Sequence, residues 1–394
     1  MNATIAEQKR VNLVSEYFQR AYDDKAKVVY VNALVPSEIL ISMGVVPFNL
    51  GSVGGIFAQA KATSGLINAG EHEYLSSDLC STSRCLVGAA HKNALPTPEF
   101  LVLTSGPCDV DSHLLHTLSR VYGKNWFLLD VPLYFKDAEQ AIDYVEEQIR
   151  KMVQALEEHL QVTFSMDRFQ QAIANTNQTL EYVRRINALA AHVPSPLSVV
   201  ETIDIVASLH LLGTRELVEV YREKHQELVQ RLEARPAPEA RRPRVLWHWL
   251  RPYYTNELFE HLHHGCNVEV LSEYDVMGIG FYGWESFDAA EHPFRALARR
   301  LLKGASNYSI ANEDFARELP GKARDFSIDG VISFSPRGCR HLVSLNQVLR
   351  DIFGKNGLPF LEVDCDCIDD RDYSFSQLKT RLDAFGEMLH ERIV

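Results

Sequence analysis

Cysteine is the residue type in this chain whose placement points most directly to chemistry. The 394 residues include seven of them: Cys80, Cys85, Cys108, Cys266, Cys339, Cys365 and Cys367. Disulfides are not expected, because the chain is long and its N-terminal residues show no apolar export signal. The cysteines are therefore metal ligands, nucleophiles or small buried apolar residues, and their positions along the chain must separate these alternatives.

Two cysteines lie where a parallel sheet binds its ligands. Cys108 follows a predicted strand at residues 100–104, and Cys339 follows another at residues 330–335. Both loops place glycine and proline beside the thiol, which suits a tight backbone approach to a bulky group. Ligands in open α/β sheets bind beyond the carboxyl ends of the strands, so both thiols are expected at a binding site.

Cys80 is expected in the first turn of a helix whose N-cap is Ser77 or Asp78. The helix dipole at that position favours a thiolate, which is the form that iron binds. Three thiolates from separate loops would hold an iron–sulfur cluster with one iron open to substrate, since electron-transfer clusters normally have four cysteines. The other interpretation is three unrelated buried cysteines on a doubly wound fold, and spacing alone does not separate the two.

The remaining four cysteines have weaker claims to a metal. Cys85 lies roughly 140° around a helix from Cys80, so we expect it to pack in the core, and Cys266 is expected to do the same. Cys365 and Cys367 follow the last predicted strand and would share one face if that strand continues. A second metal site, extra cluster ligation and simple loop packing all stay open for this pair.

A histidine tract beside Cys266 has the composition of a metal site. His261, His263 and His264 end a predicted amphipathic helix. Histidines at such a position commonly face solvent and suit the negative end of the helix dipole. Solvent-facing histidines are therefore favoured over a zinc site.

The elements expected around these residues alternate between strand and helix in two regions. Apolar runs predict four strands of a first sheet at 27–32, 45–50, 100–104 and 126–131, and four of a second at 244–249, 267–271, 330–335 and 359–363. Such runs, separated by amphipathic helices, are typical of parallel sheets covered on both faces. The segment Gly51–Gly55 is predicted as a loop and matches no phosphate-binding fingerprint, so the chain is not expected to bind ATP.

The two sheet regions are separated by a helical segment. Periodic apolar residues predict long helices at 138–160 and 167–192, and Pro236, Pro238 and Pro243 mark a stiff linker. We therefore expect an α/β fold with three parts: an N-terminal α/β domain at 1–160, a helical segment and linker at 161–242, and a C-terminal α/β domain at 243–394. Each α/β domain carries a strand that ends in a cysteine loop, as distant structural duplicates would.

Composition excludes several classes of protein. A net charge of −12 and a pI near 5.7 argue against nucleic acid as the main partner, because phosphate binding relies on a basic face. No stretch approaches the roughly 18–20 uninterrupted apolar residues that a membrane span needs. With no export signal expected, the cytoplasm is the predicted location.

Short motifs in a fixed order resemble those of the 2-hydroxyacyl-CoA dehydratase and benzoyl-CoA reductase family. The resemblance runs from about residue 30 to the end and is weakest in the helical middle. The contexts of Cys80, Cys108 and Cys339 match the three cluster ligands of that family. The matching motifs are Pro36-Ser37-Glu38, Gly44-Val45-Val46-Pro47, Ser77-Asp78-Leu79-Cys80-Ser81, Pro107-Cys108-Asp109, Arg337-Gly338-Cys339, Gly357-Leu358-Pro359, Asp366, Arg371-Asp372-Tyr373-Ser374, Gln377, Thr380-Arg381 and Ala384-Phe385.

This resemblance implies two Rossmann-like domains with a [4Fe-4S] cluster in the cleft between them, held by Cys80, Cys108 and Cys339. It also implies a homologous second subunit or homodimer, an acyl-CoA substrate and an ATP-hydrolysing iron–sulfur activator that supplies one low-potential electron. In the dehydratases that electron forms a ketyl radical on the thioester, and water is then eliminated.

Three other functions stay open within the same family. One is a subunit of an aryl-CoA reductase of the benzoyl-CoA type, and another is a small-molecule reductase with a double-cubane cluster. The third is a partner subunit that only relays electrons or supports the assembly. The dehydratase subunit is the first expectation.

Four charged residues are candidates for contact with substrate or cluster. Glu38 begins a helix after the first strand, where it either contacts substrate as a catalytic residue or only favours the helix N-terminus. Arg84, Arg337 and Arg340 flank the three cysteines. They either stabilise an anionic cluster and a CoA thioester, with Arg337 as the catalytic candidate, or serve as ordinary ion-pair partners.

Overall fold

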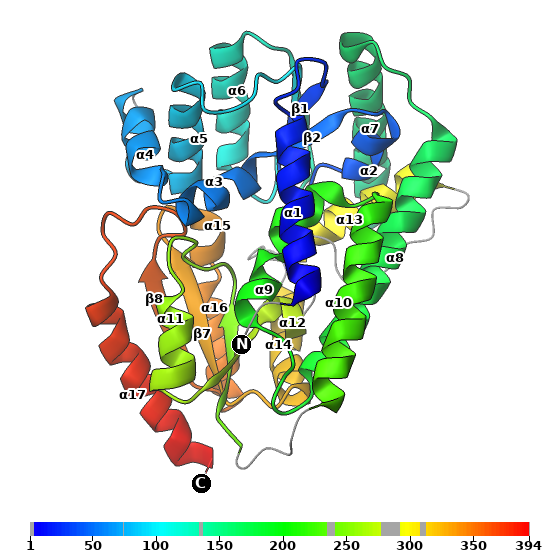
Figure 1. The fold of residues 1–394 in the computed structure, drawn as a ribbon. Coiled ribbons are helices and arrows are strands. Elements are labelled where there is room, and N and C mark those ends of the chain that lie inside the picture. The colour runs from blue at the N-terminus through cyan, green and yellow to red at the C-terminus, as the bar shows by residue number, and fades with distance from the viewer. Residues whose placement is uncertain are drawn as a thin grey trace.

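The structure is a computed structural model that describes residues 4–73, 75–133, 137–234, 241–276, 292–307 and 313–393. Two parallel sheets form separate layers, one in the upper and one in the lower half of Figure 1. Long helices of the middle segment run along one side of both halves. Most of the predicted proline linker, including Pro236 and Pro238, lies outside the described residues.

The N-terminal sheet has the order β2-β1-β3-β4, and the C-terminal sheet has the order β6-β5-β7-β8. All six strand pairings are parallel. The predicted α/β class with two parallel sheets is therefore confirmed, and both sheets repeat one topology. The strands are β1 (Val28–Val31), β2 (Val46–Asn49), β3 (Phe100–Thr104), β4 (Trp126–Leu129), β5 (Arg244–His248), β6 (Glu269–Ser272), β7 (Gly330–Pro336) and β8 (Phe360–Cys365).

Helices cover both faces of each sheet, as the apolar strands require. Every residue of β1, β3, β5 and β7 is buried, so neither face of these strands meets solvent. In the N-terminal half the helices are α1 (Ile5–Arg20), α2 (Ser37–Ser42), α3 (Leu50–Gln59), α4 (Thr63–His72), α5 (Ser81–His91), α6 (Val110–Tyr122) and α7 (Ala138–Leu160).

The middle segment is helical, as predicted. It contains α8 (Met166–Ala190), α9 (Val199–Ile203), a 3-10 helix (Asp204–Leu211) and α10 (Arg215–Glu233). The C-terminal half contains α11 (Glu257–Glu260), a π-helical turn (His261–Gly265), α12 (Glu273–Val276), α13 (Pro293–Asn307), α14 (Glu313–Asp325), α15 (Arg340–Val343), α16 (Asn346–Lys355) and α17 (Phe375–Ile393). None of the described helices is both long enough and apolar enough to cross a membrane.

One predicted loop is a helix. Gly51–Gly55 forms the first half of α3, because the side chain of Asn49 accepts a hydrogen bond from Gly51 N at 3.0 Å and caps the helix. Glycine is required here by packing rather than by turn geometry. A Cβ on Gly54 would lie 3.0 Å from Thr82 Cγ2, so α3 approaches α5 closely.

The C-terminal half contributes a helix to the N-terminal core. Apolar residues of α13, such as Leu297 and Leu301, belong to the same buried cluster as Ile149 and Met152 of α7. In Figure 1, α13 accordingly lies high in the molecule, beside α7 and α8. The boundary at residue 243 stays a prediction, because the core of the N-terminal sheet is completed by residues beyond it.

Candidate cofactor site

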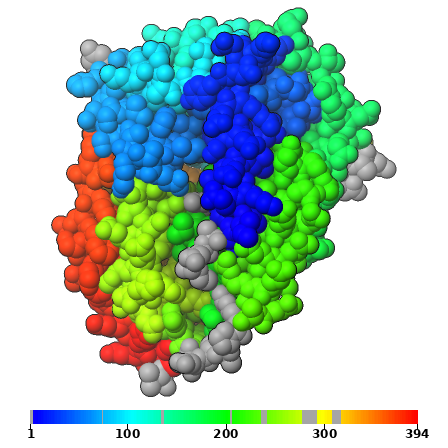
Figure 2. All heavy atoms as spheres, viewed as in Figure 1, coloured from blue at the N-terminus to red at the C-terminus, as the bar shows by residue number. Residues whose placement is uncertain are grey.

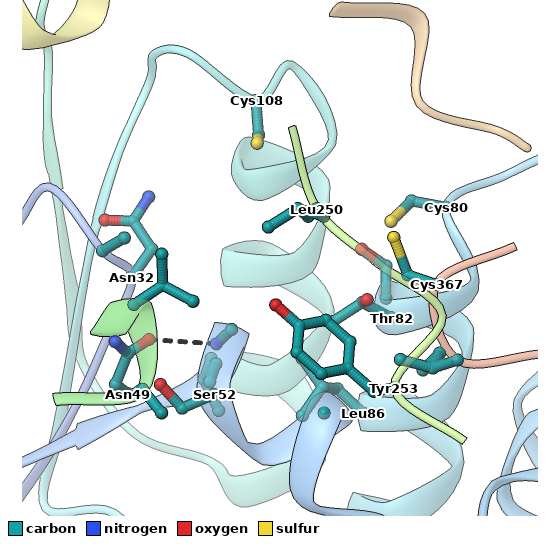
Figure 3. Close-up of a pocket in the computed structure, with 18 of the residues that line it drawn as sticks. Asn32, Asn49, Ser52, Cys80, Thr82, Leu86, Cys108, Leu250, Tyr253 and Cys367 are labelled. Atoms are coloured by element: carbon teal, nitrogen blue, oxygen red, sulfur yellow. Dashed lines mark hydrogen bonds between the residues drawn. The ribbon is translucent and has the colours of Figure 1, made fainter. Parts of the chain in front are cut away.

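A cavity of about 380 Å³ lies between the two sheets and takes its lining from both halves and the middle segment. Four cysteines line it: Cys80, Cys108, Cys339 and Cys367. Three of them come from a helix start or a loop after a strand, as predicted. Figure 2 shows a narrow opening beside α1, where the blue N-terminal half meets the yellow-green segment, and Figure 3 shows three of the thiols around one space.

Cys80 and Cys339 are N-cap residues, of α5 and α15 respectively. The prediction that the helix begins after an N-cap at Ser77 or Asp78, with Cys80 in its first turn, is wrong, because α5 begins at Ser81. The thiol of Cys80 makes no capping hydrogen bond, but the N–H groups of Thr82 and Ser83 at the start of α5 act to lower its pKa. The N–H groups of His341 and Leu342 act on the pKa of Cys339 in the same direction, again without a capping hydrogen bond.

A glycine brings the two caps together across the domains. Gly338 has a φ of +74°, in the left-handed region that glycine adopts without strain. A Cβ at this position would lie 2.9 Å from Leu79 O and 3.1 Å from Asp78 O. The backbone before Cys339 therefore touches the backbone before Cys80, and a larger residue at 338 would separate the two thiols.

Cys108 lies in the loop between β3 and α6, beside two polar groups of the cavity. Asn32, which follows β1, donates from Nδ2 to Asp111 Oδ2 at 2.6 Å and to Thr104 Oγ1 at 2.9 Å. Burial raises the pKa of Asp111 to about 6, even though the hydrogen bond from Asn32 favours its charged form. The Asp111 carboxyl can therefore hold or release a proton near neutral pH at the edge of the cavity.

The three predicted thiols are protonated in the metal-free protein. Burial raises the pKa of Cys108 well above its usual range and that of Cys339 to about 12, and the pKa of Cys80 is raised for the same reason. The N–H donors at Cys80 and Cys339 offset only part of this effect. The helix end favours the thiolate of Cys80 as expected, but burial has the larger effect, so a metal that binds here must displace the proton.

The donor set of the cavity fits an iron–sulfur cluster. Cys80, Cys108 and Cys339 line the same cavity, and a negative charge on Cys80 or Cys339 would raise the pKa of Cys108. Thiolate is the ligand that iron–sulfur clusters take, and the apolar surroundings suit a cluster shielded from water. The structure thus brings together the three cysteines singled out from the sequence.

Glu38 lies away from this cavity, in the interior. It is 0% exposed, and its Oε1 accepts hydrogen bonds from Thr176 Oγ1 at 2.9 Å and from Arg300 Nη1 at 2.7 Å. These contacts tie α2 to α8 and α13. They give Glu38 a structural role, while its contact with substrate stays a prediction.

Of the three flanking arginines, Arg337 alone lines the cavity. It is half-exposed, and its guanidinium lies 3.3 Å from both Asp364 and Asp372. Arg84 is buried in an ion-pair network with Glu71 and Asp369, and Arg340 is mostly exposed. Arg337 therefore remains the arginine best placed to contact a substrate.

The two C-terminal cysteines line different cavities: Cys367 lines the first, and Cys365 lines a second one of about 230 Å³. Strand β8 ends at Cys365, so the pair does not share a face as a longer strand would have required. Cys365 lines the second cavity, where Tyr254 Oη lies 3.0 Å from its sulfur. Cys85 is fully buried in the core, as expected for a packing residue.

The histidine tract contributes one side chain to a possible metal group away from the cavity. His261 Nε2 lies 2.5 Å from Asp383 Oδ1, and the sulfur of half-buried Cys266 lies 3.7 Å from the same oxygen. The rings of His263 and His264 pack against each other instead. Because Lys379 Nζ pairs with the second oxygen of Asp383 at 2.7 Å, the hydrogen-bonded arrangement already satisfies this carboxylate.

Sequence reasoning missed several residues of the cavity. Asn32 directly follows β1 and Asp111 lies in the first turn of α6, so attention to the ends of the strands could have found both. Tyr253 comes from a loop whose course depends on the packing of the C-terminal half, so no local signal marks it. Cys367, which follows the last predicted strand, was among the sequence candidates for extra cluster ligation.

Comparisons with known proteins identify the family of the chain. A family model described as 2-hydroxyglutaryl-CoA dehydratase, D-component, matches residues 32–389. The chain is 22% identical to the alpha subunit of lactoyl-CoA dehydratase from Anaerotignum propionicum, over 95% of each chain. It is 19% identical to the (R)-phenyllactyl-CoA dehydratase alpha subunit of Clostridium sporogenes, over 92% of this chain and 89% of the relative. A benzoyl-CoA reductase subunit of Thauera aromatica is 22% identical, over 84% of this chain and 81% of the relative.

Proposed function

We infer the function of this chain from its family, because it belongs to the 2-hydroxyglutaryl-CoA dehydratase D-component family. We propose that it is the iron–sulfur subunit of an ATP-activated 2-hydroxyacyl-CoA dehydratase, a lyase that eliminates water from its substrate. The observation that carries this proposal is the convergence of Cys80, Cys108 and Cys339, from both halves of the chain, on one cavity.

The three thiolates would hold a [4Fe-4S] cluster in this cavity. When bound, such a cluster supplies a low-potential electron and a Lewis-acidic iron for the thioester carbonyl. The relatives are named as subunits, which supports a second subunit as partner, and an ATP-hydrolysing activator would deliver the electron. We propose a cytoplasmic location, where the seven cysteines would stay reduced.

The rest of the cavity indicates what acyl group it would take. Apolar side chains predominate beside the thiols, among them Val14, Leu34, Ile56, Leu114 and Leu250. Of the cations that line it, Arg10 is ion-paired with Glu7 at 2.6 Å and Arg337 with two aspartates. This lining favours an apolar 2-hydroxyacyl chain over one with a second carboxylate, which would need a cationic partner.

The polar groups at the edge of the cavity would handle the proton and the leaving hydroxyl. Asn32 holds the Asp111 carboxyl in place, so a proton on Asp111 would face the cavity beside Cys108. Arg337, at the mouth, would meet the anionic CoA portion. These residues bind and orient the substrate, and the apolar lining excludes water.

Counting electrons per product tests the proposed reaction. A dehydratase returns the electron after each turnover, so product should exceed the reductant consumed by about tenfold or more once the activator has acted. A reductase, as the similarity to a benzoyl-CoA reductase would allow, consumes reductant in proportion to product. The assay combines this chain, its partner and the activator with a 2-hydroxyacyl-CoA, and proportional consumption would contradict the lyase.

A further inference from the structure

Cys367 is, among the described residues, the one cysteine besides the three family ligands that lines the cavity between the sheets. It is buried, with 8% of its surface exposed. Figure 3 shows its sulfur directed toward that of Cys80, with Cys108 across the same space. The cavity therefore presents four thiols, one more than an open cluster needs.

The loop that carries Cys367 is fastened to the helix that carries Cys80. Asp366 Oδ1 accepts a hydrogen bond from Ser81 Oγ at 2.6 Å. Asp366 directly precedes Cys367 in the chain, and Ser81 directly follows Cys80. The same oxygen accepts from the N–H groups of Ile368 and Asp369, each at 2.9 Å. One buried carboxylate thus fixes the two cysteines side by side.

Two further contacts hold the loop from the other side. Tyr253 N donates to the carbonyl of Cys367 at 2.8 Å, and Thr63 Oγ1 donates to the carbonyl of Ile368 at 2.9 Å. Cys367 is therefore held in the wall of the cavity that the three family ligands also line, with its sulfur directed toward that of Cys80.

We propose that Cys367 is the fourth thiolate ligand of the cluster in the substrate-free protein. The inference rests on the proposed function, because it requires a cluster at Cys80, Cys108 and Cys339. As the bond forms, the Cys367 thiol loses its proton to solvent, its sulfur takes the open position on the fourth iron, and a water molecule leaves. No oxidation state changes. A substrate carbonyl then reaches that iron only by displacing Cys367.

Mild oxidation distinguishes a four-thiolate cluster from a three-thiolate one. A [4Fe-4S] cluster with three protein ligands loses its unprotected iron to an oxidant such as ferricyanide and leaves a [3Fe-4S] cluster with its own EPR signal, whereas four cysteines retain all the iron. The anaerobically purified wild-type chain is expected to keep about four irons. Cys367→Ser should lose about one iron per chain and show the [3Fe-4S] signal.

Cys365→Ser is the matched control, since this thiol lies two residues away but lines the other cavity. It should behave as wild type. Wild-type protein that loses iron as readily as Cys367→Ser would overturn the proposal. Mössbauer spectra of the wild type provide a second measurement that needs no variant. One iron whose spectrum differs from that of the other three would also overturn the proposal. Wild-type protein without iron or sulfide would contradict the proposed function itself.

Discussion

Cys339→Ala is expected to remove most of the iron and abolish the brown absorbance near roughly 400 nm that iron–sulfur clusters show. Cys339 would be the ligand contributed by the loop after β7, and its loss would leave a cluster held mainly from the N-terminal half. We expect iron content and dehydration rate each to fall about tenfold or more, and the same result for Cys80→Ala and Cys108→Ala. Iron analysis and visible spectra of anaerobic samples measure the effect.

Cys266→Ala is the control for this series, because Cys266 is half-buried beside Asp383 and lines neither described cavity. It should keep the iron and the colour. If any of the three ligand variants retained wild-type iron, the assignment of that cysteine would be wrong.

Glu38→Leu is expected to destabilise the protein by about 3–5 kcal/mol, the usual effect of removing one partner of a buried ion pair. The substitution leaves the Arg300 guanidinium without the carboxylate 2.7 Å away and removes the acceptor of Thr176. Urea denaturation of wild type and variant under the same conditions measures the loss. The cluster ligands lie elsewhere, so iron should stay bound while the variant is folded.

Arg340→Ala is the matched control, because this side chain is 71% exposed and lies 3.7 Å from Asp78. Its effect should stay within about 0.5 kcal/mol. A Glu38 variant with wild-type stability and no activity would instead favour the catalytic role that the sequence left open.

The strands could be predicted from the sequence because they are apolar runs, and the positions of the three candidate cysteines could be predicted from the strands and helices beside them. Parallel strands buried on both faces appear as short continuous apolar runs, and β1, β3, β5 and β7 all do. Once the strands are placed, their carboxyl ends follow, and with them the loops of Cys108 and Cys339. Cys80 lines the same cavity as these two cysteines, although its helix begins slightly later than the sequence pattern predicts.

Other features depend on packing that no local pattern encodes. The placement of α13 against α7 joins residues far apart in the chain, and an amphipathic pattern alone does not say which sheet a helix covers. Cys367 reaches the cavity because β8 ends at Cys365 and Asp366 binds Ser81, a contact across the two halves. The Gly51–Gly55 segment was predicted as a loop, but it is helical, and Gly54 allows the close approach of α3 to α5 that only the tertiary structure reveals.

The iron and acid-labile sulfide content of the anaerobically purified chain decides whether it holds a cluster at all. We expect about four of each per chain, as one cubane requires. The metal group at His261 would not confuse the result, because it would add no sulfide. A chain that folds and joins its partner but holds neither iron nor sulfide would contradict the proposal that Cys80, Cys108 and Cys339 form a cluster site.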